Sequence, residues 1–224
     1  MNRVVGFAGK AETGKSTAAE MLHTIVRPQN GQHLEFSSPI LSLAQQWMSI
    51  SLPGADSRTV IENLRDLITE AHAELVEALV KSGLESDGLQ EYLENRTSAP
   101  ITPETKGAHR QLLEWLGKGA VDHIGPTFWA DKLEMKARSS LEEGADLLTI
   151  GGVRSGYDAQ VVRNLGGSII RLTRGRKTPI LPSEAGLESW SADFDIPNDS
   201  TLEDLRYAIF QAWASTIDQA REGS

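Results

Sequence analysis

The chain has 224 residues, room for one sizeable domain and an insertion, and its 39% hydrophobic and 24% charged residues are ordinary for a globular protein. A net charge of −9 argues against a nucleic-acid polymer as partner, because such a partner needs a broad basic face. The absence of cysteine excludes disulfides, thiolate metal sites and a cysteine nucleophile, and no apolar run is long enough for a transmembrane helix, so no membrane partner is expected.

The N-terminal segment predicts a strand, a glycine-rich turn and a helix. Residues 3–8 are apolar enough for a short buried strand, and from Lys15 apolar residues recur at helical spacing until Pro28. Between them, Gly9-Lys10-Ala11-Glu12-Thr13-Gly14-Lys15-Ser16 satisfies the pattern of a phosphate-binding P-loop. A signal peptide here would remove this loop, so we expect a cytoplasmic protein.

Each part of the loop has a physical task. Glycines let the backbone approach phosphate oxygens, and turned N–H groups and the positive end of the following helix attract the anion. Lys15 is expected to hold the β- and γ-phosphates, and the Ser16 hydroxyl to bind Mg²⁺, the expected cofactor. Thr17, in the first helical turn, is expected to contact the α-phosphate. The predicted ATP-phosphate-binding residues are Gly9, Ala11, Glu12, Thr13, Gly14, Lys15, Ser16 and Thr17.

Residues 53–104 differ in composition and are expected to form a helical insertion. Apolar residues at spacings of three and four predict an amphipathic helix of roughly 25 residues with an acidic opposite face. One interpretation is a packed insertion whose acidic face is solvated. The other is a substrate-side lid or the surface of a homodimer.

The remaining chain predicts alternating strands and helices, which indicate a parallel sheet covered on both faces. In chain order these elements are a strand at 33–36, a helix from Ser37-Ser38-Pro39, a helix over 105–121 ending near Gly117 or Gly119, a helix from Pro126, a strand at 146–150 ending in Gly151-Gly152, a helix closed by Gly166-Gly167, strands at 168–173 and 192–197, and a C-terminal helix starting at Ser200 or Thr201.

A P-loop alone does not say where the γ-phosphate goes. Small GTPases need an Asn-Lys-x-Asp segment, and this sequence has none. Motor and helicase ATPases need a hydrophobic strand that ends in an acidic pair, but the comparable strand here, Leu147 to Ile150, ends in Gly-Gly. Kinases of small metabolites instead need cations around the transferred phosphate. Arginines follow the third and fourth predicted strands at their carboxyl ends, where open α/β sheets bind ligands. The candidate catalytic residues are therefore Lys15, Arg154, Arg174 and Arg176.

In the order of its segments the chain resembles the phage-type deoxynucleoside monophosphate kinases, within the nucleoside monophosphate kinase-like P-loop group. The similarity covers most of residues 1–50 and 105–210. Its pieces are the P-loop, the stretch from Glu35 to Leu41, Arg110 to Gly117, Ile124 to Trp129, Gly152-Val153-Arg154, Leu165 to Arg174, Pro182-Ser183-Glu184, and Ala192 to Leu202.

The resemblance implies a single P-loop α/β domain over residues 1–224, with a five-stranded parallel sheet in the order 2-3-1-4-5 and a lid at about 174–188. It implies transfer of the ATP γ-phosphate to a deoxynucleoside monophosphate, giving the diphosphate, in the host cytoplasm if the protein is phage-encoded. Residues implied to bind the acceptor are Phe36, Ser37, Arg110, Glu114, Trp129 and Arg154.

Several of these roles have alternatives. Phe36 or Trp129 could stack on a base or simply pack in the core, and Arg110 could bind the acceptor phosphate or form a surface ion pair. Lys118 stands near a position where relatives often carry arginine. Gly152 stands where many relatives have an acid, and Pro182 where many have histidine.

The activity has alternatives too. A dephospho-coenzyme A kinase, or another small-metabolite P-loop kinase, belongs to the same class of enzyme. In a different class, the protein would be an NTP-binding regulator or assembly ATPase that uses its acidic helix as an interaction surface.

Overall fold

The computed structural model describes residues 3–50, 100–102, 105–175, 186–187 and 189–222. The chain divides into two compact units. The sheet unit comprises Met1–Phe36 and Ala130–Ser224, and the helical unit comprises Ser37–Trp129. The expected insertion at 53–104 falls within the helical unit, and its predicted amphipathic helix lies outside the described residues.

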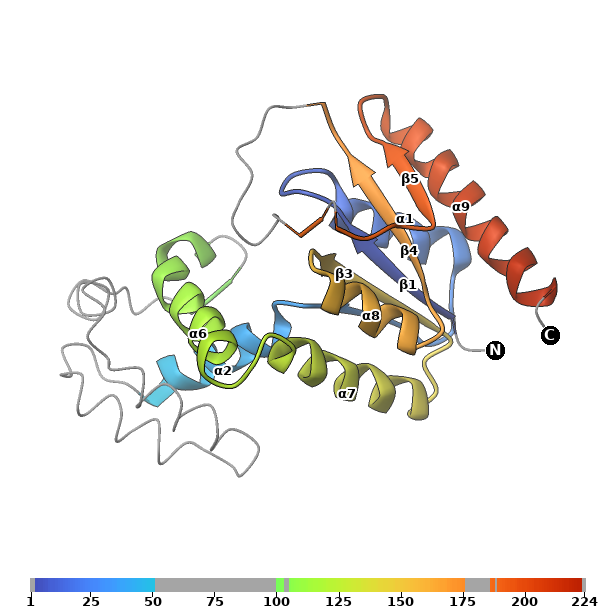
Figure 1. The fold of residues 1–224 in the computed structure, drawn as a ribbon. Helices are drawn as coiled ribbons and strands as arrows, with labels where there is room; N and C mark the ends of the chain where they lie inside the picture. The colour runs from blue at the N-terminus through green and yellow to red at the C-terminus, as the bar shows by residue number, and fades with distance from the viewer. Residues whose placement is uncertain (1–2, 51–99, 103–104, 176–185, 188, 223–224) are drawn as a thin grey trace. The chain divides into compact units, whose positions relative to one another are not determined.

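The sheet unit contains a parallel sheet with five strands among the described residues (Figure 1). The strand order is β2-β3-β1-β4-β5, and each neighbouring pair is parallel. This confirms the predicted α/β fold class and strand order. The strands are β1 (Arg3–Ala8), β2 (Gly31–Glu35), β3 (Leu147–Val153), β4 (Ser168–Thr173) and β5 (Phe194–Pro197).

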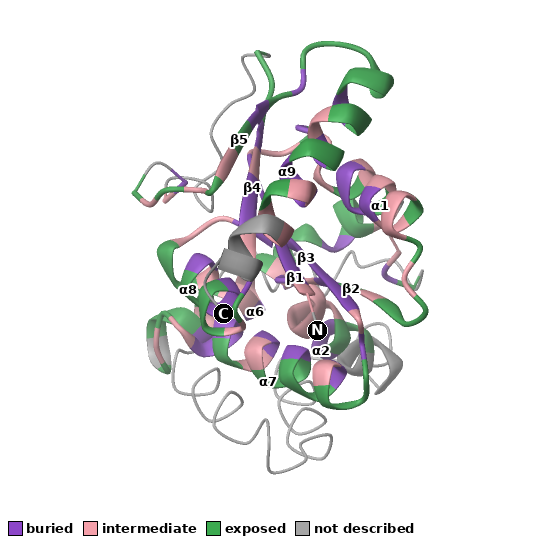
Figure 2. Ribbon diagram, turned by 90° about the vertical axis from the view of Figure 1, so that its right-hand side faces the viewer, coloured by how far each residue is buried: buried purple, intermediate pink, exposed green. Residues whose placement is uncertain are grey.

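Helices cover both faces of this sheet. Successive side chains of a strand point to opposite faces, and β1 carries apolar side chains on both, so each face needs a cover. Val5 and Phe7 of β1 pack with α1 (Lys15–Val26) and α9 (Leu202–Glu222) on one face. Val4 and Ala8 pack on the other face with α8 (Gly156–Asn164) and with the part of α7 (Phe128–Glu142) that belongs to the sheet unit. Burial in the central strands is nearly continuous (Figure 2), as expected when both faces are covered.

Short polar side chains start two of these helices. The Ser155 side chain and the Asp158 side chain form a capping box at the start of α8. Thr201 and Asp204 do the same before α9: the Asp204 backbone N–H donates to Thr201 Oγ1, and the Thr201 N–H donates to Asp204 Oδ2. The C-terminal helix therefore begins after Thr201, one of the two predicted starts.

The helical unit contains, among its described residues, α2 (Ser38–Ile50), the 3-10 helix η2 (Lys106–His109) and α6 (Arg110–His123). The prediction that α6 ends near Gly117 or Gly119 is wrong, because the helix continues to His123. Gly117 lies inside the helix: a Cβ there would lie 3.6 Å from Ile40 Cδ1, an ordinary contact distance, and its carbonyl accepts a hydrogen bond from Trp129 Nε1 at 3.0 Å. No described helix combines the length and apolar content that a membrane crossing requires.

Candidate functional site

The predicted P-loop joins β1 to α1 at the carboxyl edge of the sheet. Its backbone takes positive φ angles at Gly9 (136°), Glu12 (61°) and Gly14 (94°). Side chains would not fit at the two glycines: a Cβ on Gly9 would lie 2.3 Å from the Leu172 carbonyl oxygen, and one on Gly14 would lie 2.6 Å from Asn198 Nδ2. The loop therefore has the turned, side-chain-free backbone that phosphate binding needs.

Lys15, the first residue of α1, turns back toward the start of this loop. Its ammonium donates to the carbonyl oxygens of Gly9 at 2.9 Å and Lys10 at 2.5 Å. Thr13 is buried, and its hydroxyl donates to the Lys10 carbonyl at 2.9 Å. These contacts hold a positive charge within the loop next to the positive end of α1, where an anion would be attracted.

Arg174 lies beside the loop, as its candidate role requires. Arg174 Nη1 donates to the Glu12 carbonyl at 3.3 Å, and its Nε donates to the Asn198 carbonyl at 2.9 Å. The structure thus brings a cation from the end of β4 to a loop more than 150 residues earlier in the chain. Arg176, the other candidate after β4, lies outside the described residues.

Asn198 is a part of the site that sequence reasoning did not assign. It follows β5, is buried, and donates from Nδ2 to the Thr13 carbonyl at 2.9 Å. Its own backbone N–H donates to the Thr173 carbonyl at 2.7 Å, which ties the ends of β4 and β5 to the P-loop. Asn198 lies within the stretch from Ala192 to Leu202 that resembles the nucleotide kinases, but nothing local in that stretch indicates this contact.

A pocket of about 200 Å³ opens between the P-loop and the end of β4. Arg171 belongs to its wall but has structural contacts: it lies 4.8 Å from the ring centre of Trp190 and donates to the Trp190 carbonyl. Leu187, within the predicted lid range of 174–188, is buried in the core. Most of that range is outside the described residues, so the lid stays a prediction.

The end of β3 differs from the expected strand boundary at Ile150. The strand runs on through Gly151 and Gly152 to Val153. Gly6 of β1 pairs with Ile150 and Ala8 pairs with Val153, so β3 holds one extra residue in this stretch, a β-bulge. Gly152 has a φ of 76°, which glycine adopts at little cost.

The space beside these glycines contains the carboxylate of Glu35, the last residue of β2. A Cβ on Gly151 would lie 2.1 Å from Glu35 Oε1, and one on Gly152 would lie 2.9 Å from Oε2. Only glycines therefore admit the carboxylate in this position.

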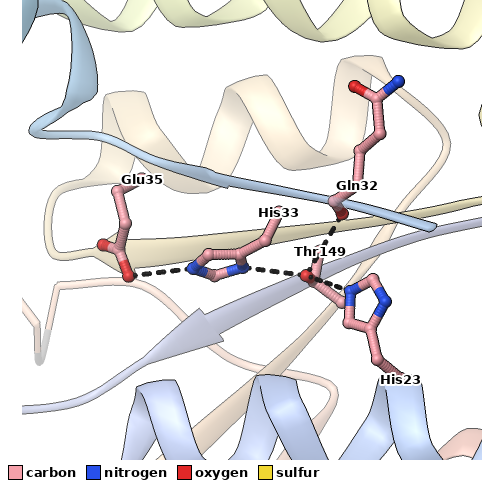
Figure 3. Close-up of polar contacts among 5 residues, drawn as sticks. All are labelled: His23, Gln32, His33, Glu35 and Thr149. Atoms are coloured by element: carbon pink, nitrogen blue, oxygen red, sulfur yellow. Dashed lines mark hydrogen bonds and ion pairs between the residues drawn. The ribbon is translucent and has the colours of Figure 1, made fainter.

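A chain of polar contacts joins Glu35 to the sheet interior (Figure 3). His33 Nε2 lies 3.2 Å from Glu35 Oε1, and His33 Nδ1 lies 2.8 Å from Thr149 Oγ1. His23 Nε2 lies 2.9 Å from the same hydroxyl, which is fully buried. Thr149 Oγ1 also lies 3.4 Å from the Gln32 carbonyl oxygen, which can only accept its single hydroxyl proton. The direction of the two His33 contacts depends on the tautomer of its ring.

The pKa of His23 is lowered. Burial is the larger cause, because it disfavours the charged ring, and the nearby His33 adds to it. A neutral His23 can donate from Nε2 to the Thr149 hydroxyl oxygen.

Arg154 follows β3 directly. Its neighbour Val153 pairs with Ala8, the residue before Gly9, so Arg154 and the P-loop begin at adjacent strand ends. The backbone N–H groups of Arg154 and Ser155 both donate to Asp158 Oδ2 at 2.9 Å. Burial raises the pKa of Asp158, although these hydrogen bonds and the Arg154 charge oppose the shift. Asp158 fixes the turn that carries Arg154, a role that sequence reasoning missed.

The residues implied to bind an acceptor are divided between the two units. Phe36 and Arg154 belong to the sheet unit, and Ser37, Arg110, Glu114 and Trp129 to the helical unit. Phe36 is buried in the core of the sheet unit. Trp129 is buried too and packs edge-on against Phe128, with ring centres 4.9 Å apart. Their acceptor roles stay predictions.

Two ion pairs lie on the exposed surface of α6, and each joins residues four positions apart in the helix. Arg110 Nε lies 2.9 Å from Glu114 Oε1, the surface pairing that was the alternative to acceptor binding. Lys118 pairs with Asp122 in the same way.

The residues present fit a magnesium ion that arrives with its nucleotide. Ser16 offers a hydroxyl in the first turn of α1, and Mg²⁺ needs only one or two protein oxygens because phosphates and water supply the rest. Among the described residues, no three His, Asp or Glu side chains gather as a separate metal site.

Comparison with known proteins gives only partial or distant similarities. No protein-family model matches the sequence. An 88-residue segment, 39% of the chain, is 32% identical to part of the isopentenyl-diphosphate delta-isomerase of Deinococcus radiodurans, and the match covers 24% of that enzyme's length. The chain thus spans about a quarter of this curated relative.

Among solved structures, the dephospho-CoA kinase from Campylobacter jejuni aligns over 100% of this chain and 99% of its own. The sequence identity is 16% and the TM-score 0.44. The likeness is too distant to transfer an activity, so the case for function rests on the geometry of the loop.

Proposed function

We propose that the protein is an ATP- and Mg²⁺-dependent kinase that transfers the γ-phosphate to a (deoxy)nucleoside monophosphate. The observation that carries the proposal is the contact of Arg174 with the P-loop backbone at Glu12, which adds a second cation to a loop that already holds the Lys15 ammonium. Two cations beside one phosphate loop suit a reaction in which charge builds on transferred oxygens.

The chemistry then consists mainly of positioning. An oxygen of the acceptor phosphate forms a bond to the γ-phosphorus as the bond to the β,γ-bridging oxygen breaks, and ADP leaves. Lys15 and Arg174 neutralise the phosphates, and Arg154, at the neighbouring strand end, is proposed to face the transferred group. Bound Mg²⁺ would supply further neutralisation of the donor phosphates, with Ser16 as its protein ligand.

A coupled assay of ADP release tests the reaction. ATP and Mg²⁺ would be combined with a panel of deoxynucleoside and ribonucleoside monophosphates and with dephospho-coenzyme A. Turnover that depends on a monophosphate supports the proposal. Turnover only with dephospho-coenzyme A would assign the other kinase activity. Hydrolysis indifferent to every acceptor would refute the kinase and favour an NTP-driven regulator or assembly ATPase.

The role of Lys15 is tested by Lys15→Ala, with Lys10→Ala as the matched control from the same loop. Removing one hydrogen-bond donor that stabilises transition-state charge costs about 10²- to 10³-fold in rate, and a charged donor such as Lys15 is expected to matter at least as much. We expect at least this loss for Lys15→Ala and a small effect for Lys10→Ala, with both variants folded by circular dichroism. Near wild-type turnover in Lys15→Ala would disprove the site assignment.

A further inference from the structure

The carboxyl end of β3 lacks an acid, although P-loop nucleotide enzymes hold Mg²⁺ with the Ser or Thr of the loop and an acid of a neighbouring strand. Gly151 and Gly152 stand there instead, and both are buried. We propose that Glu35, from β2, supplies this carboxylate and orients the nucleotide-bound Mg²⁺. The inference rests on the proposed function only in assuming that a nucleotide–magnesium complex binds at the P-loop.

The first argument is the position of the carboxylate. Its two oxygens lie where side chains of residues 151 and 152 would begin, 2.1 Å and 2.9 Å from the positions of the two missing Cβ atoms. Glu35 starts on the outer strand β2, but its charge is carried over β3, the strand next to β1 and the P-loop. The bulge at Gly151-Gly152 opens this space, so the glycine pair and the glutamate form one feature.

The second argument is the edge of the sheet at which the charge lies. Glu35 pairs with Gly151, and Ala8, which precedes the P-loop, pairs with Val153. Both residues lie at the carboxyl ends of parallel strands, and neighbouring strands of a sheet are about 5 Å apart. Magnesium prefers oxygen ligands and keeps several waters, so a carboxylate over β3 can act on the ion through its water shell.

The third argument is that the carboxylate is held by a built network rather than left on the surface. His33 contacts it at 3.2 Å and is itself fixed by Thr149, whose side chain is fully buried. The Glu35 side chain is 33% exposed, which leaves access for a hydrated ion. His33 and Thr149 are positioning residues: they touch the carboxylate or its partner and fix its direction.

The test measures metal binding directly. Wild type, Glu35→Gln and the control Glu142→Gln, an exposed acid at the end of α7, would be titrated with Mn²⁺ at saturating ADP, with free Mn²⁺ followed by electron paramagnetic resonance. Loss of a group that orients a metal's ligands typically weakens metal affinity 10- to 100-fold. We expect a loss of this size in Glu35→Gln only, with ADP affinity in EDTA unchanged in all three proteins.

A second variant separates metal binding from stability. Gly151→Ala introduces the Cβ that clashes with Oε1, so it should displace the carboxylate and weaken Mn²⁺ binding as Glu35→Gln does. The two changes combined should weaken it no more than Glu35→Gln alone. Binding of ADP in EDTA reports that each variant is folded.

The Mn²⁺ titration tests the role of Glu35 separately from the kinase assay, so either proposal can fail without the other. Mn²⁺ affinity of Glu35→Gln within twofold of wild type overturns the inference, as does loss of ADP binding in EDTA, which would give Glu35 a structural role. Wild-type protein that binds Mn²⁺–ADP but phosphorylates no acceptor would refute the proposed kinase and leave the role of Glu35 to stand on the Mn²⁺ result.

Discussion

The amide of Asn198 is predicted to hold the P-loop to the rest of the sheet unit. Asn198 and Thr13 are both 4% exposed, and the amide donates to the Thr13 carbonyl at 2.9 Å. Asn198→Ala removes this donor and leaves a buried carbonyl unpaired, which costs about 1–3 kcal/mol. A middle value of about 2 kcal/mol lowers the folding equilibrium constant roughly 30-fold.

Asn198→Asp should cost more than Asn198→Ala near neutral pH. Aspartate has almost the same shape, but an ionised oxygen would face the Thr13 carbonyl, so two acceptors would meet in a buried place. The order of stability is therefore wild type, then Asn198→Ala, then Asn198→Asp.

Urea unfolding followed by circular dichroism measures this order. Asn164→Ala is the matched control, because Asn164 is exposed and its amide contacts the exposed Gln160 and the partly buried Glu134; its change should stay within about 0.5 kcal/mol. ATP affinity should fall in both Asn198 variants. Wild-type stability in Asn198→Ala, or Asn198→Asp more stable than Asn198→Ala, would show that the amide does not anchor the loop.

Three further changes test other parts of the molecule. The lowered pKa of His23 means that the folded state binds fewer protons than the unfolded state once the pH falls below the ordinary value of 6.5. In urea titrations, wild type should therefore lose more stability between pH 8 and pH 5 than His23→Asn. Parallel curves of stability against pH for the two proteins would contradict this. Leu133→Ala, in the fully buried core, should cost about 2–5 kcal/mol, whereas Met135→Ala, 68% exposed, should stay within about 0.5 kcal/mol by the same assay. Gly117→Ala in α6 should raise the melting temperature by adding up to about 1 kcal/mol, because its Cβ meets Ile40 only at an ordinary contact distance; a lower melting temperature would show that α6 tolerates no side chain there.

Features set by neighbouring residues could be predicted from the sequence. The P-loop is a continuous pattern, and the helix from Lys15 to Val26 follows from apolar spacing and Pro28. The alternation of strands and helices predicted a parallel sheet, and the resemblance to nucleotide kinases supplied its order. Arg174 was predicted from its place after a strand, because strand ends meet at one edge.

Features set by distant residues could not be predicted in this way. Asn198 meets Thr13 across 185 positions, and His33 meets Thr149 across 116. Glycine often follows the end of a helix, but α6 continues through Gly117, whose carbonyl accepts a hydrogen bond from Trp129, 12 residues away in the chain. The glycine pair after Ile150 was interpreted as the end of a strand, because only the structure shows the Glu35 carboxylate that these glycines admit.

The lengths of the strands bear on how the protein behaves at high concentration. Among the described residues, the outer strands β2 and β5 are the shortest of the sheet, with five and four residues. An outer strand offers unpaired backbone groups to other chains, and a short or charged one offers few. Pro197 ends β5 and has no backbone N–H to donate, so this outer strand offers even fewer hydrogen bonds to another chain. Short outer strands and this proline should therefore keep the sheet from adding strands of other molecules.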